Sequence, residues 1–297
     1  MRHRHLLGII LSGMTAATAA TAQDTFRHTL GETTVTLLSE RQQTGNKGIL
    51  IGATPEMLAK TAPDGTFPNA VNAFLVQTPT QTVLVDTGFG TKLFDNLKAF
   101  GVSPEKIDAV LLTHMHGDHI GGLLRDGKPA FPNADVYLAT PERDHWTAEA
   151  APDTPQKKVL AAYRDRLHLF TPAALGEVAD GKRWQREPLP GNVTAIAAYG
   201  HTPGHTMFQI DAGGQSLLIW ADLTHAMAVQ MPYPSVAVTY DVDPAQAVRS
   251  RLAVLEYAAK SGIPVAGMHI PYPGIGTVAK DADGYRFTPQ PTESARP

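Results

Sequence analysis

The chain has 297 residues, of which 43% are hydrophobic and 18% are charged, with 26 Gly, 23 Pro and no Cys. This composition excludes a collagen, a coiled coil and a long disordered chain, and it suits one large α/β domain. The lack of Cys excludes disulfide frameworks, thiolate zinc sites and cysteine nucleophiles. Because a net charge of −3 gives no broad attraction for nucleic acid, we expect no nucleic-acid partner.

The first 22 residues have the features of a secretory signal peptide. Arg2 and Arg4 precede an apolar stretch at 6–14, and Ala20-Thr21-Ala22 supplies the small residues of a cleavage site. The apolar stretch is shorter than the about 20 residues that span a bilayer. We therefore predict cleavage after Ala22, a mature domain at 23–297 in the periplasm or secreted, and no membrane partner after cleavage.

Strands and helices alternate in both halves of the remaining chain. In chain order, the hydrophobic pattern predicts strands at 71–76 and 82–85, a helix at 92–100, strands at 107–112 and 134–139, helices at 141–148 and 155–167, strands at 193–198, 207–210 and 216–220, a helix at 244–260 and a strand at 263–268. No linker, charge block or low-complexity tract separates the halves. The pattern therefore predicts one α/β domain built from two similar halves.

A histidine-rich segment directly follows the predicted strand at 107–112: His114, His116, Asp118 and His119 lie within six residues. Open α/β sheets usually place their chemistry in loops at the carboxyl ends of strands. Three imidazoles and a carboxylate suit a borderline divalent metal such as Zn²⁺. Four donors so close in the chain cannot easily converge on one tetrahedral ion. We therefore predict two ions, one bound by the first two donors and one by the last two.

Further donors follow the later predicted strands. His201-Thr202-Pro203-Gly204-His205 follows the strand at 193–198, and its Pro-Gly turn is expected to aim His205 at the site. Asp222 follows the strand at 216–220, and His269 follows the strand at 263–268. A single buried His is usually a packing or capping residue, but repeated donors at strand ends favour a metal site. The context of His225 leaves packing and function both open.

These residues resemble the signature of the metallo-β-lactamase superfamily, with His-x-His-x-Asp-His at 114–119 and Asp86-Thr87-Gly88 upstream. The resemblance runs over roughly residues 30–290 and implies a single-domain αβ/βα four-layer sandwich with a dinuclear metal site. It implies these ligand sets: His114, His116 and His205 for one ion, and Asp118, His119 and His269 for the other. Asp222 would bridge both ions, and Asp86 would orient a ligand His without binding metal. Zinc is the first expectation, with Mn, Fe and Co as alternatives.

Within the superfamily, the chain is most similar to the methyl parathion hydrolase and lactonase-like group. The matching stretches are Phe131-Pro132-Asn133-Ala134, His201 to Thr206, Asp222-Leu223 with Ala228-Val229-Gln230, Pro234-Ser235-Val236, His269 to Gly276, and Gly284-Tyr285-Arg286-Phe287. The resemblance implies an exported enzyme with two divalent metals that acts on a small-molecule lactone, ester or organophosphate. It also implies a homodimer.

Members of that group line the pocket for the leaving group with three aromatic side chains. Trp146 matches one of them, and Phe94 or Phe89 supplies the second. The third position holds Val159, and His225 stands where some members carry an aliphatic residue. The resemblance therefore predicts that Trp146, Phe94, Phe89 and His225 bind substrate. Because one of the three aromatic positions is not aromatic, we expect a weaker preference for aryl phosphotriesters than in the group.

The predicted function is that of an exported dinuclear metal-dependent hydrolase. A hydroxide bridging two metals would attack a lactone or ester carbonyl, or the phosphorus of a phosphotriester. Asp118 or Asp222 would act as the catalytic carboxylate that passes a proton to the leaving oxygen. The alternatives are a β-lactamase-like amide hydrolase that uses the same metals and a metal-binding protein without catalytic activity.

Overall fold

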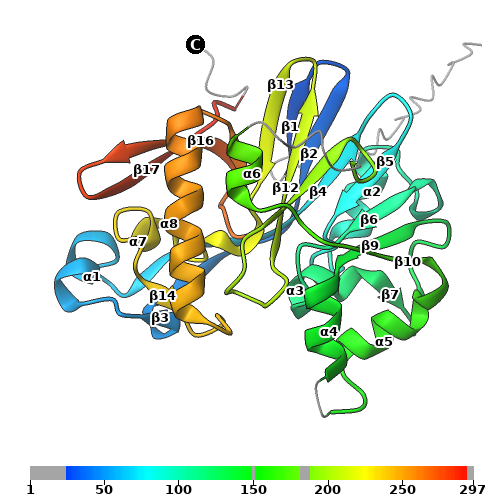
Figure 1. The fold of residues 1–297 in the computed structure, drawn as a ribbon, viewed down its shortest axis with the longest axis horizontal. Helices are drawn as coiled ribbons and strands as arrows, with labels where there is room; N and C mark the ends of the chain where they lie inside the picture. Colours follow the sequence, from blue (N-terminus) through cyan, green and yellow to red (C-terminus); the bar gives the residue numbers. More distant parts are fainter. Residues whose placement is uncertain (1–24, 149–150, 181–187, 293–297) are drawn as a thin grey trace, which may run out of the picture.

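The computed structural model describes residues 25–148, 151–180 and 188–292, so the predicted signal peptide at 1–22 lies outside the described residues. Two large β-sheets pack together, with α8 (Pro244–Ser261) beside one and α4 (Thr140–Ala148) and α5 (Pro155–Ala162) beside the other (Figure 1). Among the described residues, no helix combines the length and the apolar character that crossing a bilayer requires.

The first sheet has seven strands and the second has six. The order in the first sheet is β1 (Thr25–Leu30), β2 (Thr33–Asn46), β4 (Thr66–Gln77), β5 (Thr82–Val85), β6 (Ala109–Leu111), β9 (Asp135–Ala139) and β10 (Leu167–Phe170). The order in the second is β11 (Val193–Ala197), β12 (Thr206–Ala212), β13 (Gln215–Ile219), β15 (Val265–Ala266), β16 (Ile275–Asp281) and β17 (Gly284–Pro289).

Shorter elements complete the described fold. They are the strand pairs β3 (Leu50–Ile51) with β14 (Ala237–Val238) and β7 (Leu124–Arg125) with β8 (Lys128–Pro129), and the helices α1 (Pro55–Thr61), α2 (Leu93–Ala99), α3 (Gly117–Ile120), α6 (Leu175–Ala179) and α7 (Met227–Gln230).

The alternation of apolar side chains along the strands explains the layers. Successive residues of a strand point to opposite faces. In β4 and β5, Leu75 and Leu84 therefore pack against the helical layer, whereas Phe74, Val83 and Val85 pack against the second sheet. A third apolar cluster lies between the second sheet and α8. Three apolar interfaces separate four layers, so the αβ/βα sandwich predicted from the sequence is confirmed.

Helix α8 covers the outer face of the second sheet because its apolar residues share one side. Val254 and Leu255 pack in the same cluster as Leu218 of β13. The helix begins where the Asp243 side chain accepts a hydrogen bond from the Gln246 backbone N–H, and it ends before Gly262, which has a left-handed φ of 66°. Burial of one helix face thus fixes the loop that precedes α8 against the sheet.

Two predicted elements differ from the structure. The helix expected at 155–167 ends at Ala162, and after a short 3-10 turn the chain forms β10, which pairs in parallel with β9. The strand expected at 263–268 is regular only as β15. In both places pairing with a neighbouring strand decides the outcome, and such pairing is invisible in local hydrophobic periodicity.

Parallel strands bring several loops to one edge of the sandwich. Strands β5 and β6 are parallel, and so are β13 and β15. The loops at their carboxyl ends contain Asp86 after β5, His114 after β6, Asp222 after β13 and His269 after β15. The Thr206 backbone N–H of β12 donates to the Thr113 carbonyl at 3.0 Å and links the second sheet to the loop after β6. The topology therefore collects donors from both halves of the chain.

Candidate metal centre

Asp86 fixes the start of the histidine loop after β6. Its backbone has a left-handed φ of 58°, a strained conformation for a residue other than glycine, and its side chain is buried. Its carboxylate accepts hydrogen bonds from the Thr113 backbone N–H at 2.8 Å and the Thr113 hydroxyl at 2.7 Å. The same carboxylate lies 2.7 Å from His119 Nδ1. Asp86 thus holds the ring of His119 and lies outside the candidate donor groups.

Asp222 lies at the centre of the histidines, in the short 3-10 turn Ala221–Leu223 after β13. Its Oδ2 atom faces the Nε2 atoms of five imidazoles: His225 and His269 at 3.1 Å, His119 at 3.2 Å, His201 at 3.3 Å and His114 at 3.6 Å. A carboxylate oxygen has two lone pairs and cannot accept hydrogen bonds from five donors. Asp222 Oδ1 and His119 Nε2 are buried without a hydrogen-bond partner among the described residues. Cations between these atoms would satisfy them.

The donor atoms form three overlapping groups, and the atoms within each group lie within 4.8 Å of one another. The groups are His114, His116, His201 and Asp222; Asp118, His119 and His269; and Asp222, His225 and His269. In the first group, His116 Nδ1 lies 3.0 Å from both His114 Nε2 and His201 Nε2. Two nitrogens on one tetrahedral zinc ion lie roughly 3.3 Å apart. The residues therefore fit divalent ions.

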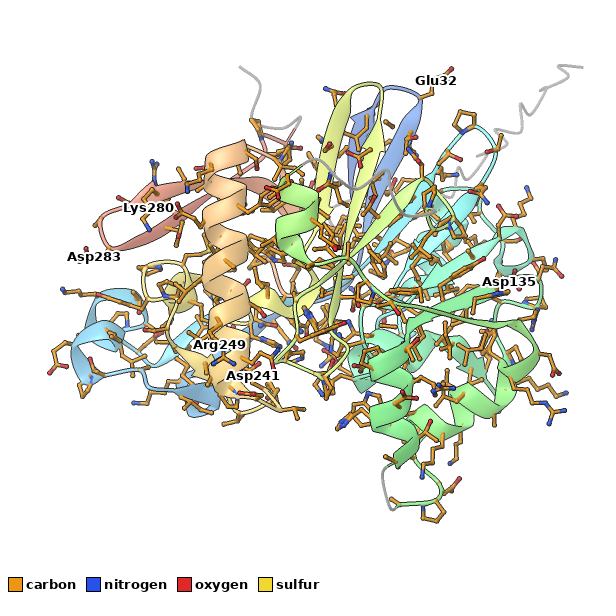
Figure 2. The ribbon with its side chains drawn as sticks, viewed as in Figure 1. Glu32, Asp135, Asp241, Arg249, Lys280 and Asp283 are labelled. Atoms are coloured by element: carbon orange, nitrogen blue, oxygen red, sulfur yellow. The ribbon has the colours of Figure 1, made fainter. Side chains whose placement is uncertain are left out.

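The outer ring nitrogens of the candidate ligands are held by fixed acceptors. His201 Nδ1 donates to Asp241 at 2.9 Å, and His269 Nδ1 donates to the Ala70 carbonyl at 2.7 Å. Asp241 lies in the loop before α8, near the lower end of that helix (Figure 2). These hydrogen bonds set the tautomer and turn Nε2 toward the centre, as is usual for histidines that bind metals.

Burial and charge give these histidines different protonation states. Burial and the nearby His119 lower the pKa of His114 well below its ordinary value. Burial and the nearby His201 lower the pKa of His116 to about 3. Both are therefore neutral at pH 7, which is the form that binds metal. Burial opposes protonation of His201 too, but hydrogen bonds and charges of Asp222 and Asp241 outweigh it and raise its pKa to about 8.

Of the two histidines of the Pro-Gly turn, His201 and not the predicted His205 lies in a candidate donor group. His205 Nδ1 lies 2.9 Å from the Ala198 carbonyl, and its Nε2 accepts the Asp222 backbone N–H at 3.1 Å. Both ring nitrogens are thus engaged, and His205 supports the backbone of Asp222. His201 takes the place predicted for His205, and the other six predicted ligands do lie in the candidate groups.

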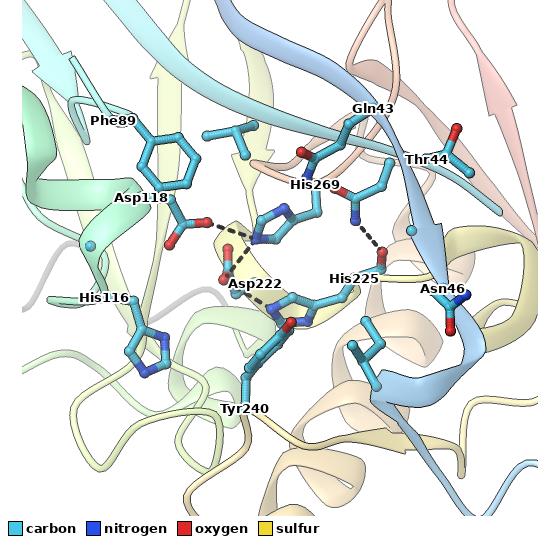
Figure 3. A pocket seen from close by; sticks show the side chains of 15 residues that line it. Gln43, Thr44, Asn46, Phe89, His116, Asp118, Asp222, His225, Tyr240 and His269 are labelled. Atoms are coloured by element: carbon cyan, nitrogen blue, oxygen red, sulfur yellow. Dashed lines mark hydrogen bonds and ion pairs between the residues drawn. The ribbon is translucent and has the colours of Figure 1, made fainter. Parts of the chain in front are cut away.

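A cavity of 580 Å³ opens above the donors. Asp118, Asp222, His225 and His269 lie at its floor, and the dashed lines in Figure 3 join them in one chain of contacts. Its walls are neutral: Gln43, Thr44, Asn46 and Asn69 alternate with apolar and aromatic side chains from Ile49, Val71, Phe89 and Tyr240. The cavity thus combines a polar floor with neutral walls.

The predicted substrate-binding residues separate into two sets. Phe89 and His225 line the cavity, and His225 also belongs to a candidate metal group. Trp146 and Phe94 do not line this cavity, although the Trp146 ring packs edge-on against His116 with 5.8 Å between the ring centroids. The Trp146 side chain is 9% exposed and donates its indole N–H to Glu142, while Phe94 stacks on Phe131 in the core. These contacts use the aromatic side chains for packing.

Sequence reasoning missed two residues of the candidate site: His201, which lies in the first donor group, and Asp241, which accepts its hydrogen bond. The available signal for His201 was its place in the same Pro-Gly turn as His205. Asp241 stands in no recognisable pattern in the chain. Val159, which stands where the resemblance expects the third aromatic residue, is a buried residue of α5 in the core and does not line the cavity.

Comparison with known families now identifies the class of protein. Residues 66–262 match the family model of the metallo-beta-lactamase superfamily. The chain belongs to this superfamily, which confirms the resemblance at that level.

Among curated proteins, the chain is 28% identical to ribonuclease Z of Mycolicibacterium gilvum over 171 residues, which cover 50% of this chain and 54% of that protein. It is 33% identical to the atrochrysone carboxyl ACP thioesterase of Passalora fulva over 96 residues, which cover 31% of this chain and 25% of that protein. The matches span about half the length of these relatives or less. Because ribonuclease Z is among them, the comparisons do not support the expected exclusion of nucleic acid.

Two solved structures resemble the chain over nearly its whole length. The hydrolase AbOPH of the beta lactamase superfamily superposes with a TM-score of 0.79 and 26% identity, covering 92% of this chain and 100% of that one. AidC, described as a dizinc quorum-quenching lactonase, superposes with a TM-score of 0.79 and 24% identity, covering 90% and 98%. At 24% identity the second likeness concerns the fold alone.

Proposed function

We propose that the protein is a dinuclear metal-dependent hydrolase that opens lactones or cleaves esters, with phosphotriesters as secondary substrates. The observation that supports this most directly is the pair of adjoining donor groups at the floor of a neutral-walled cavity. The likeness to AbOPH and the described activity of AidC agree with it.

We assign His114, His116 and His201 to one ion, Asp118, His119 and His269 to the other, and Asp222 to both. Zinc is the first choice, with Mn, Fe and Co as alternatives, because imidazole and carboxylate ligands suit all four. When bound, divalent ions lower the pKa of a water molecule to supply a nucleophile and polarise the carbonyl or phosphoryl oxygen.

Of the two predicted catalytic carboxylates, Asp118 is placed to meet the substrate. Its side chain is 23% exposed and lines the cavity, whereas that of Asp222 is 2% exposed beneath it. Burial opposes ionisation of Asp118, but the nearby His119 and His269 outweigh it and lower its pKa. An ionised Asp118 can take a proton from the attacking water at its carboxylate oxygen and pass it to the leaving oxygen.

The walls favour a neutral substrate with an apolar part. Cavities of about 300–1,000 Å³ hold small molecules, and the amides of Gln43 and Asn69 can orient a polar ring while Phe89 and Tyr240 contact an apolar substituent. Trp146 packs edge-on behind His116 and Phe94 stacks on Phe131, so neither ring lines the cavity as an aryl leaving group would require. We therefore rank phosphotriesters below lactones and esters.

The test is hydrolysis by metal-loaded protein of an acyl-homoserine lactone, an aryl ester and a β-lactam, with metal content measured on the same preparation. We expect two ions per chain and turnover of the lactone or the ester. Exclusive turnover of the β-lactam would instead support the amide hydrolase. Two bound ions without hydrolysis of any substrate would support the metal-binding protein.

We further propose export and a homodimer. Cleavage after Ala22 predicts a secreted or periplasmic protein that begins at Gln23. Sequencing the amino terminus of protein recovered outside the cytoplasm tests the cleavage, and light scattering of the same sample tests the dimer. Retention of residues 1–22 would contradict export by this route.

A further inference from the structure

Glu142 is a fully buried carboxylate that belongs neither to the candidate ligands nor to the cavity lining. It lies in α4 and accepts four hydrogen bonds. Its Oε1 accepts from the Met115 backbone N–H at 2.9 Å and from Trp146 Nε1 at 2.6 Å, and its Oε2 accepts from the Thr202 hydroxyl at 2.7 Å and the Gly204 backbone N–H at 3.0 Å. An ionised carboxylate has about four acceptor positions, and Glu142 uses all of them.

The two oxygens of Glu142 hold two different loops. Met115, which donates to Oε1, lies between His114 and His116 in the loop after β6. Thr202, which donates to Oε2, directly follows His201 in the loop between β11 and β12. One side chain therefore joins the two loops that supply the three histidines of the first donor group.

Neighbouring contacts make this joint rigid. The Met115 carbonyl accepts a hydrogen bond from Gln156 Nε2 at 2.9 Å, so the backbone N–H and the backbone carbonyl of Met115 are both fixed. A Cβ atom on Gly204 would lie 2.3 Å from the Glu142 backbone nitrogen, so the turn packs directly on α4. The spacing of the two loops is therefore set by this packing together with the carboxylate that bridges them, and the carboxylate is the part that a side-chain substitution can change.

We propose that Glu142 is a positioning residue that sets the spacing between His114, His116 and His201 and thereby the affinity of the first donor group for its ion. The inference rests on the proposed function, because it requires a metal at this group. Within the described residues, the hydrogen bonds of Glu142 go to Met115, between His114 and His116, and to Thr202 and Gly204 in the turn that begins with His201. Asp118 and His119 of the second group follow in the same loop as Met115, but Glu142 makes no hydrogen bond to them or to His269. Loss of Glu142 should therefore weaken one ion selectively.

The experiment is a Co²⁺ titration of the metal-free full-length protein, followed by its visible absorption spectrum and by counting bound Co²⁺. Glu142→Gln keeps the shape but replaces one acceptor oxygen with an NH₂ group that faces N–H and O–H donors. We expect the wild type to bind two ions. Loss of a residue that supports a metal ligand typically lowers metal affinity about 10–100-fold. We therefore expect Glu142→Gln to lower the Co²⁺ affinity of one site by this factor and to leave the affinity of the other site unchanged.

Glu40→Gln is the matched control. Glu40 is also buried, and its carboxylate accepts hydrogen bonds from the Thr91 backbone N–H and hydroxyl and from the Lys92 backbone N–H. The chemical change is the same, but these partners lie at the start of α2. We expect a lower melting temperature and unchanged Co²⁺ affinity at both sites.

Each remaining outcome decides the question. The proposal is overturned if Glu142→Gln lowers the melting temperature as Glu40→Gln does and leaves both Co²⁺ affinities unchanged. It is also overturned if the variant lowers the Co²⁺ affinity of both sites equally, because Glu142 would then serve packing alone. If Glu142→Gln does not fold, Thr202→Val takes its place, because it removes one of the two hydrogen bonds to Oε2. This variant should lower the Co²⁺ affinity of the first donor group by a smaller factor, and an unchanged affinity would overturn the proposal. A wild type that binds no Co²⁺ overturns the proposed function itself.

Discussion

The floor and the mouth of the cavity are built in different ways. At the floor, fixed partners hold buried imidazoles: Asp241 accepts a hydrogen bond from His201, Asp86 lies against His119, and the Ala70 carbonyl accepts from His269. At the mouth, Phe89 is 41% exposed and Tyr240 is 52% exposed. Side chains held by several hydrogen bonds keep one geometry, whereas exposed loop residues are free to vary. We therefore expect the floor to determine the kind of reaction and the mouth to determine which substrate enters.

The largest expected effect comes from removing a floor donor. His116→Ala deletes an imidazole of the first donor group, so turnover should fall by more than the about 10–100-fold that loss of a supporting partner costs. Bound metal should fall by about one ion per chain. Metal analysis and kcat/KM on the same preparation provide the check, and a fully active, metal-free variant would contradict the account.

A pair of variants distinguishes the two histidines of the Pro-Gly turn. His201→Ala should lose one ion, because its Nε2 faces Asp222 and His116. His205→Ala should keep both ions and lose stability, because its ring holds the Ala198 carbonyl and the Asp222 backbone N–H. Metal content and urea midpoints of both variants test this. The reverse result would restore His205 as the ligand.

In the metal-free protein, the contribution of His201 to stability should be lost as the pH rises. The pKa of His201 is raised to about 8 when folded, against about 6.5 when unfolded, so its protonated form stabilises the fold below pH 6.5 and this contribution disappears as the pH rises through 8. Neighbouring histidines with lowered pKa values act in the opposite direction, so the contribution is measured as the difference in free energy of unfolding between the wild type and His201→Asn. We expect this difference to fall by on the order of 2 kcal/mol between pH 6.5 and 9 in urea unfolding of chelator-treated protein. A difference that stays the same over this pH range would contradict the assignment.

The smallest effect is expected at the mouth. Tyr240→Ala removes an exposed ring whose centroid lies 5.9 Å from that of His225. Loss of such an apolar contact typically changes KM up to about 10-fold with little change in kcat. Steady-state kinetics with two acyl chain lengths tests this, with metal content as the control. A loss of bound metal would mean that the mouth and the floor are not independent.

The sequence was sufficient to predict the fold and most of the floor. The segment from His114 to His119 is continuous, and it follows a strand, so no knowledge of distant contacts was needed. The choice between His201 and His205 depends on which ring turns inward. That direction is set by Asp241 on one ring and by the Ala198 carbonyl on the other, and neither partner is identifiable in the chain.

The mouth was predicted less well for the same physical reason. Trp146 lies one turn after Glu142 on α4, donates its indole N–H to that carboxylate and packs edge-on against His116, while Phe94 stacks on Phe131. Only tertiary packing decides whether an aromatic ring lines a cavity or fills a core. Residue type and spacing therefore predict chemistry better than they predict substrate.

The most direct test compares kcat/KM for an acyl-homoserine lactone with that for methyl parathion in one metal-loaded preparation, with a structured RNA as a third substrate. The account predicts a lactone value higher by about 100-fold or more, which is about 2.7 kcal/mol of transition-state binding. A higher value for methyl parathion would mean that the mouth forms an aryl pocket after all. Cleavage of RNA without turnover of either small molecule would contradict the central claim.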